Sequence, residues 1–128
     1  SLGPRIQDAR IADLFAGKKR SHNEILLESM KRVVDENLSN PDLSLALIAD
    51  QCAVSEVYAS QFFKEQAGEQ FSHYVEQRRM ELARTLLADP RLQVKEVANA
   101  VGFRNVNSFT RAFKRSTRFT PTEYRSLS

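Results

Sequence analysis

The stretch FSHYVEQRRMELARTLLAD, residues Phe71 to Asp89, predicts one uninterrupted helix. It contains no glycine or proline, and most of its residues are good helix formers. Its apolar residues recur at helical spacing, on one stripe as Phe71, Val75, Leu82 and Leu86 and on the other side as Met80 and Leu87. A helix of this kind can pack on two faces. Because a similar short unit lies on either side of it, we interpret it as a spacer between two units.

The first unit, residues 44–68, reads as two short helices joined by a tight turn. Ser44 caps the first helix, which runs to Cys52, and Ser55 caps the second, which ends at Gly68. The residues expected to face inward are Leu45, Ile48, Ala49 and Cys52 from the first helix, and Tyr58, Ala59, Phe62 and Phe63 from the second. This order of elements is typical of a helix-turn-helix.

The second unit repeats the first. The matching pairs before the turn are Ala49 with Ala98 and Ala53 with Gly102, each 49 residues apart, and the pair after the turn is Phe63 with Phe113, 50 residues apart. The second turn is therefore one residue longer than the first. Such an internal repeat is the strongest structural signal in the chain.

These elements predict an all-α fold of about seven helices, with two helix-turn-helix subdomains joined by a long linker helix. The first subdomain is expected at residues 21–70, the linker helix at 71–89 and the second subdomain at 90–128. Capping boxes at Ser21 and Thr120 begin the first and the last of these helices. Residues 1–20 are expected to form an N-terminal extension or linker, with a short amphipathic helix that carries Ile6, Ile11, Leu14 and Phe15.

Charge is distributed unevenly between the two units. The chain has a formal net charge of +3. Residues 91–118 hold seven basic residues and one acidic residue, a net charge of +6, whereas residues 44–68 hold one basic and three acidic residues, a net charge of −2. A concentrated basic segment favours a polyanionic partner, although a solvated charged surface would give the same count.

The second helix of each unit is expected to enter the major groove of DNA. With the phenylalanines facing inward, the residues expected to read bases are Val57, Ser60 and Gln61 in the first unit and Val106, Asn107, Thr110 and Arg111 in the second. The residues expected to contact phosphates are Ser55, Lys64, Arg104, Asn105 and Lys114, the two cap residues through their helix N-termini. A linker helix of 19 residues spans about 28 Å at about 1.5 Å per residue. That length is compatible with adjacent major-groove segments about 34 Å apart.

Residues from about Glu28 to Tyr124 resemble the DNA-binding domain of AraC/XylS-type transcription regulators. The most specific match lies in the second unit, in Val97-Ala98, Val101-Gly102-Phe103, Ser108-Phe109, Arg111, Phe113-Lys114, Thr120-Pro121 and Tyr124-Arg125. The resemblance implies seven helices, double-stranded DNA as the partner and a role in gene regulation. It also implies contact with RNA polymerase, a separate sensing or dimerisation domain outside this chain, and a bacterial cytoplasmic location, at the nucleoid when bound.

The chain departs from the family pattern at four positions. Ala53 stands where a turn glycine is common, and Arg118 stands where the family usually has glycine. Gln61 replaces a frequent arginine, which suggests that the first unit contributes less electrostatic affinity. Arg78 occupies a linker position that is often apolar, so it is expected to face solvent or to extend its charged end toward it.

Other function classes find little support in the sequence. His22 and His73 are isolated, the single Cys52 lies on an inward face, and no glycine-rich phosphate loop is present, so we expect neither an enzyme nor a metal or cofactor site. No apolar run is long enough to span a membrane, so no membrane contact is expected. An RNA binder would need an exposed aromatic platform. The main alternative is a helical protein-interaction module that contacts the transcription machinery.

Overall fold

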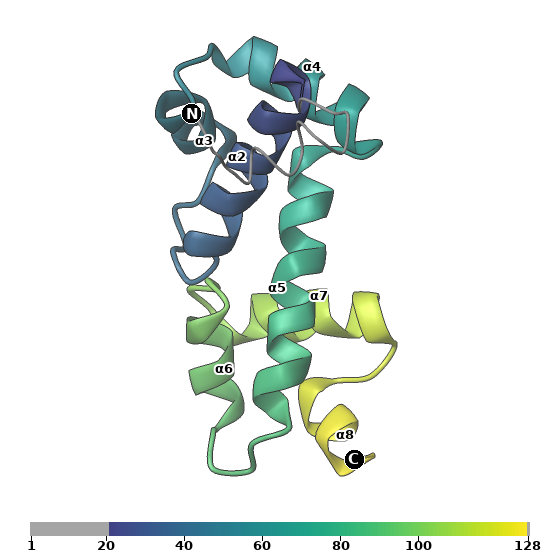
Figure 1. The fold of residues 1–128 in the computed structure, drawn as a ribbon. Helices are drawn as coiled ribbons and strands as arrows, with labels where there is room; N and C mark the ends of the chain where they lie inside the picture. The colour runs from purple at the N-terminus through teal and green to yellow at the C-terminus, as the bar shows by residue number, and fades with distance from the viewer. Residues whose placement is uncertain (1–20, 128) are drawn as a thin grey trace, which may run out of the picture.

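The computed structural model describes residues 21–127, and over these residues all regular structure is helical (Figure 1). The seven helices are α2 (His22–Glu36), α3 (Leu45–Gln51), α4 (Glu56–Ala67), α5 (Phe71–Leu87), α6 (Val94–Ala100), α7 (Val106–Thr117) and α8 (Pro121–Ser126). The predicted all-α architecture of two helix-turn-helix subdomains is confirmed. The short helix expected near Ile6 to Phe15 lies outside the described residues.

Helix ends follow the capping residues of the sequence. At Ser21 the backbone N–H donates to Glu24 Oε1 over 2.8 Å, and the Glu24 N–H donates to Ser21 Oγ over 3.1 Å, which completes a capping box. Thr120 and Glu123 form the same box before α8. The linker helix α5 ends two residues earlier than predicted, because Pro90 disfavours the helical conformation at the residue before it.

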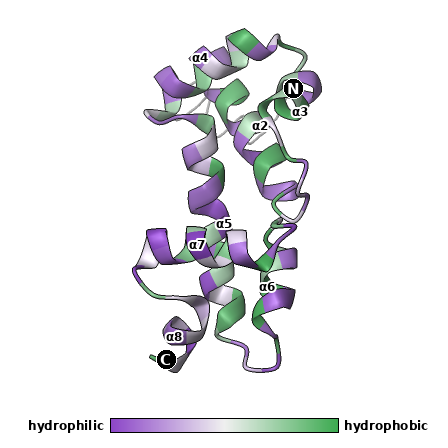
Figure 2. Cartoon of the chain, turned by 180° about the vertical axis from the view of Figure 1, so that it is seen from behind, coloured by the Kyte–Doolittle hydropathy of each residue, from purple (hydrophilic) through white to green (hydrophobic). Residues whose placement is uncertain are grey.

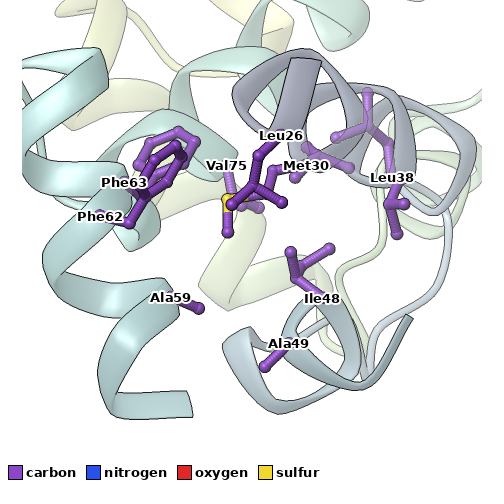
Figure 3. Packing of buried hydrophobic residues seen from close by; sticks show 11 residues of the cluster. Leu26, Met30, Leu38, Ile48, Ala49, Ala59, Phe62, Phe63 and Val75 are labelled. Carbon is purple, nitrogen blue, oxygen red and sulfur yellow. The ribbon is translucent and has the colours of Figure 1, made fainter. Parts of the chain in front are cut away.

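Two separate hydrophobic cores lie at the two ends of the molecule. Figure 3 shows the first, where side chains of α2, α3 and α4 meet Val75 of α5 around the buried Met30 and Phe63. The second core is built by α6, α7 and the C-terminal half of α5, which contributes Met80, Ala83 and Leu87. Each half of the linker helix is thus part of one subdomain's core.

Position along the axis of α5, and not only the side of the helix, decides which core a residue joins. Leu82 packs against both cores. Leu86 packs against the second core, although its periodicity placed it on one stripe with Phe71 and Val75 of the first. The stripe is continuous in sequence, but the two subdomains divide it.

Helix α4 lies across the N-terminal end of α5, and α7 crosses α5 near its middle (Figure 1). The view from behind in Figure 2 shows the same arrangement, with a hydrophilic middle of α5 between its more apolar ends. That middle is the run Glu76-Gln77-Arg78-Arg79. At the far end, Tyr124 of α8 packs edge-on against Phe113 with ring centroids 5.3 Å apart, so α8 closes the second core.

Candidate nucleic-acid interface

The two turns have the same hydrogen-bonding pattern, residue for residue. In the first, the Ala53 N–H donates to Asp50 O and the Val54 N–H to Ala49 O, over 3.2 and 2.9 Å. In the second, Gly102 donates to Asn99 O and Phe103 to Ala98 O, over 3.1 and 2.9 Å. The repeat deduced from sequence is therefore a repeat of backbone geometry. The one additional residue of the second turn is Arg104, which lies between Phe103 and the cap residue Asn105.

Helix α4 presents the predicted polar face to solvent. Ala59, Phe62 and Phe63 are buried, while Val57, Ser60, Gln61 and Lys64 are exposed, Val57 at 70%. Ser55 Oγ accepts the Tyr58 N–H over 3.1 Å and fixes the start of the helix. All the residues predicted to read bases from the first unit therefore share one accessible face.

Helix α7 also presents its predicted polar face to solvent, with Thr110 as the one exception. Phe109, Ala112 and Phe113 are buried, and Val106, Asn107, Arg111 and Lys114 are exposed. Thr110 is only partly exposed, since it lies at the edge of the buried face beside Phe109. The Asn105 side-chain oxygen accepts the N–H groups of Asn107 and Ser108, over 2.7 and 3.1 Å, so the cap itself occupies two of the amides predicted to face a phosphate.

An open groove of about 790 Å³ lies beside α5, between α4 and the second turn. Its walls come from the start of α3, from α4, from the N-terminal half of α5 and from the second turn, through Ser60, Gln61, Lys64, Arg79 and Phe103 among others. Glu76 lines the groove and pairs with Arg115 of α7 over 3.3 Å. The reading face of α4 therefore borders this groove, and α7 is connected to its wall through the Arg115–Glu76 pair.

Two ion pairs connect the second subdomain to the rest of the molecule beside this groove. Arg104, predicted to contact phosphate, pairs with Asp42 in the loop between α2 and α3, and both side chains are mostly exposed. Arg115 pairs with Glu76 of α5. Exposed pairs of this kind contribute little to stability, so both arginines stay available to a polyanion.

Sequence reasoning missed three features of this surface. Tyr58 was expected inside but is 45% exposed, because Ala59, Phe62 and Phe63 fill the core side of α4 and leave Tyr58 to stack on Phe62 at 5.7 Å. Arg115 was not singled out, although it lies one helical turn after Arg111 on the same face. Arg79 carries no local signal of its role, since its contacts are to residues about 40 positions away.

Two cationic side chains in the middle of α5 have different surroundings. Arg78 donates to Asp35 Oδ1 over 3.0 Å and to Glu81 Oε1 over 2.7 Å, and the bond to Asp35 raises its pKa. Arg79 is partly buried, and burial lowers its pKa. The expectation that Arg78 reaches toward solvent fits its position, since its charged end lies among exposed carboxylates.

The described part of the chain offers little to other chemistries. Over residues 21–127, no three His, Cys, Asp or Glu side chains cluster where they could hold a metal ion. No helix within the same range is long and apolar enough to cross a bilayer.

Leu45 and Cys52 were expected inside, but both are only partly buried at the edge of the first core. Burial there raises the pKa of the Cys52 thiol.

Comparisons with known proteins agree with this geometry. Residues 48–126 match a family described as a helix-turn-helix domain. The chain is 35% identical over 124 residues to the HTH-type transcriptional regulator YijO of Escherichia coli K12, covering 97% of this chain but 40% of that protein. The C-terminal domain of AraT, a response regulator from Geobacillus stearothermophilus, superimposes with a TM-score of 0.80 at 30% identity, covering 84% of this chain and 89% of that one.

A second solved structure shares the fold alone. It is the DNA-binding domain of AdpA, a global transcriptional factor, in complex with a target DNA, with a TM-score of 0.73 at 23% identity, covering 79% of this chain and 90% of that one. The family match spans more than half of the chain, and YijO exceeds 30% identity over nearly all of it. The chain belongs to the helix-turn-helix family of AraC-type transcription regulators.

Proposed function

We propose that this chain binds double-stranded DNA by placing α4 and α7 in two adjacent major-groove segments on one face of the duplex. The observation that carries this proposal is that α4 and α7 each expose a polar face while both pack on the same helix, α5. A protein with two recognition helices in one chain needs no second copy to span two groove segments. At about 1.5 Å per residue, the 17 residues of α5 cover about 25 Å, and the widths of the two subdomains supply the rest of the distance.

The chemistry of each face suits a different task. On α7, Arg111 can donate two hydrogen bonds to guanine O6 and N7, and Asn107 can pair with adenine. On α4, Gln61 can pair with adenine and Val57 can contact a thymine methyl group. Lys64, Lys114 and Arg104 supply phosphate contacts, which hold the protein on the duplex and carry no sequence information.

The whole regulator is expected to contain more than this chain. This chain corresponds to 40% of YijO, and AraT is described as a response regulator of which the matching part is the C-terminal domain. We infer that a sensing or dimerisation domain belongs to the same protein and that the DNA-bound regulator contacts RNA polymerase. In this arrangement the chain acts through binding and performs no catalysis of its own.

Footprinting on a duplex selected from a random library would test the two-helix proposal. We expect two protected major-groove segments on one face, about one helical turn apart, at a stated salt concentration. Arg111→Ala should weaken binding to the selected site while it leaves binding to unrelated duplex nearly unchanged. A module that only contacts proteins would give no footprint, and its DNA affinity would not respond to Arg111→Ala. Protection of a single segment would limit the function to one recognition helix.

A further inference from the structure

We propose that Arg79 is a positioning residue that fixes the spacing and relative orientation of the two recognition helices. It would do so by clamping the second turn onto the loop between α2 and α3. This inference rests on the proposed function, because spacing matters only when both helices read the same duplex. The clamp is built from five contacts, which join the first subdomain, the linker helix and the second subdomain at one point.

Arg79 itself makes the central contacts. Its Nε donates to Leu38 O over 3.2 Å and its Nη2 donates to Asn40 O over 2.8 Å, so the planar guanidinium binds two carbonyls of the first subdomain. The same group lies over the ring of Phe103 in the second turn, 5.9 Å from its centroid. One side chain of α5 thus contacts both subdomains.

The second turn packs directly on this guanidinium through Gly102. A Cβ atom at that position would lie 2.4 Å from Leu38 O and 2.7 Å from Arg79 Nη2, closer than real side chains approach. Gly102 also has φ of +86°, a conformation that glycine adopts without strain. The contact therefore requires a glycine here for two independent reasons.

The additional residue of the second turn adds a fifth contact, an exposed ion pair. Arg104, which has no counterpart in the first turn, pairs with Asp42. The three partners of the clamp on the first subdomain therefore all lie within residues 38–42: Leu38, Asn40 and Asp42. Arg79 has no carboxylate within ion-pair distance among residues 21–127, so it acts through its geometry and not as half of a salt bridge.

A clamp at this point matters because the middle of α5 belongs to neither core. Without it, the two subdomains would be connected by the continuous helix α5, by Leu82, which packs against both cores, and by the exposed Arg115–Glu76 pair. Each base pair inserted between two half-sites turns one relative to the other by about 34° and moves it by about 3.4 Å, since 10–10.5 base pairs make one turn of 34–36 Å. A clamped protein tolerates one spacing, whereas an unclamped one can follow a changed spacing at the expense of a lower affinity for the original site.

The test measures this tolerance on the selected duplex and on versions with one or two base pairs inserted between the protected segments. We expect wild type to lose about 30-fold or more in affinity on the two-base-pair insertion, whereas Arg79→Met loses less than about 5-fold and binds the original spacing more weakly. Arg79→Lys, which keeps the charge but lacks the planar fork, should fall between them. If Arg79→Met shows the wild-type penalty for the insertion, the inference is overturned.

Arg78→Met is the matched control. It removes the same charge one residue away, but within residues 21–127 the ion pairs of Arg78 are to Asp35 and Glu81, and neither residue lies on α6, α7 or α8. This variant should keep the wild-type spacing penalty. A penalty relaxed equally in Arg78→Met would assign the effect to charge on α5 and would contradict the clamp.

A second measurement needs no DNA and keeps the two proposals distinguishable. In a Cys52→Ser background, spin labels at the exposed positions Gln66 on α4 and Lys95 on α6 report the distance between subdomains. Wild type should give one narrow distance distribution, and Arg79→Met should give a broader one. If Arg79→Met does not fold, Arg79→Lys takes its place in this measurement. A narrow distribution in the folded variant would overturn the clamp, whereas failure of wild type to bind two segments would overturn only the proposed function.

Discussion

The two helix-turn-helix subdomains share one backbone geometry but place their glycines at opposite ends of it. In the first, the left-handed turn residue is Ala53 (φ 59°) and the left-handed helix cap is Gly68 (φ 78°). In the second, the turn residue is Gly102 (φ 86°) and the cap is Arg118 (φ 73°). Both caps donate their N–H four residues back, to Lys64 O and Lys114 O. Each subdomain therefore carries one left-handed residue with a side chain, which costs it backbone strain.

The positions of these glycines reflect different surroundings. The second turn must approach Leu38 O and Arg79, so a side chain cannot fit there. The turn at Ala53 is exposed, and its methyl group is tolerated. The second subdomain is therefore docked onto the rest of the molecule through its turn, whereas the exposed turn at Ala53 does not dock onto the other subdomain. The two subdomains also differ in net charge, because the basic residues are concentrated in the second.

The largest expected effect comes from adding a methyl group at each glycine. Gly102→Ala should reduce the free energy of unfolding by about 2–5 kcal/mol, from left-handed strain plus overpacking against the clamp. Gly68→Ala should cost only about 1–2 kcal/mol, because no atom lies within 4 Å of the new methyl group. Urea denaturation of both variants measures the difference. Equal losses would show that the second turn is not more tightly packed.

The second-largest effect is expected from the residues of α4 and α7 that we propose to contact bases. Arg111→Ala should weaken binding to the selected duplex by about 1–3 kcal/mol, roughly 5- to 150-fold, and relax the preference at one base pair. Gln61→Ala should cost less than Arg111→Ala, since it removes a neutral side chain from a segment with a net charge of −2. Fluorescence anisotropy at one fixed salt concentration gives both affinities. A larger loss for Gln61→Ala would reverse the proposed division of work.

A smaller effect compares the two lysines at equivalent positions. Lys114→Ala should weaken all duplexes about equally and reduce the slope of log affinity against log salt by roughly one. Lys64→Ala should change the slope less, because Glu65 and Glu56 on the same helix already offset its charge. Titrations at several salt concentrations decide this. An unchanged slope in Lys114→Ala would remove this lysine from the phosphate contacts.

The smallest effect relieves the strain at the two left-handed residues. Ala53→Gly and Arg118→Gly should each stabilise the protein by about 0.5–1 kcal/mol, as the left-handed strain exceeds the entropy that glycine adds to the unfolded chain. Thermal unfolding measures both changes. Ala53→Gly should leave DNA affinity unchanged, whereas Arg118→Gly should lower it slightly by removing one basic residue. Destabilisation by either change would show that the side chain has a role beyond the turn.

Much of the candidate site followed from local patterns. The caps at Ser55 and Asn105 and the buried phenylalanines of α4 and α7 fixed which face of each helix is exposed, so most proposed DNA-contacting residues could be named from spacing. Tyr58 was misplaced because helical periodicity leaves positions at the edge of the apolar stripe ambiguous. Thr110 lies at the same kind of edge, and its partial burial has the same origin.

By itself, the sequence determined the helices, their caps and the repeated turn, because each of these depends on interactions between residues at most about five positions apart. Only the tertiary structure decided which core each residue of α5 joins and that Arg79, Gly102 and Arg104 meet one loop about 40 to 60 residues away. Such contacts depend on how two independently formed subdomains are docked. Local periodicity carries no information about that docking, since the same helices would form in either orientation.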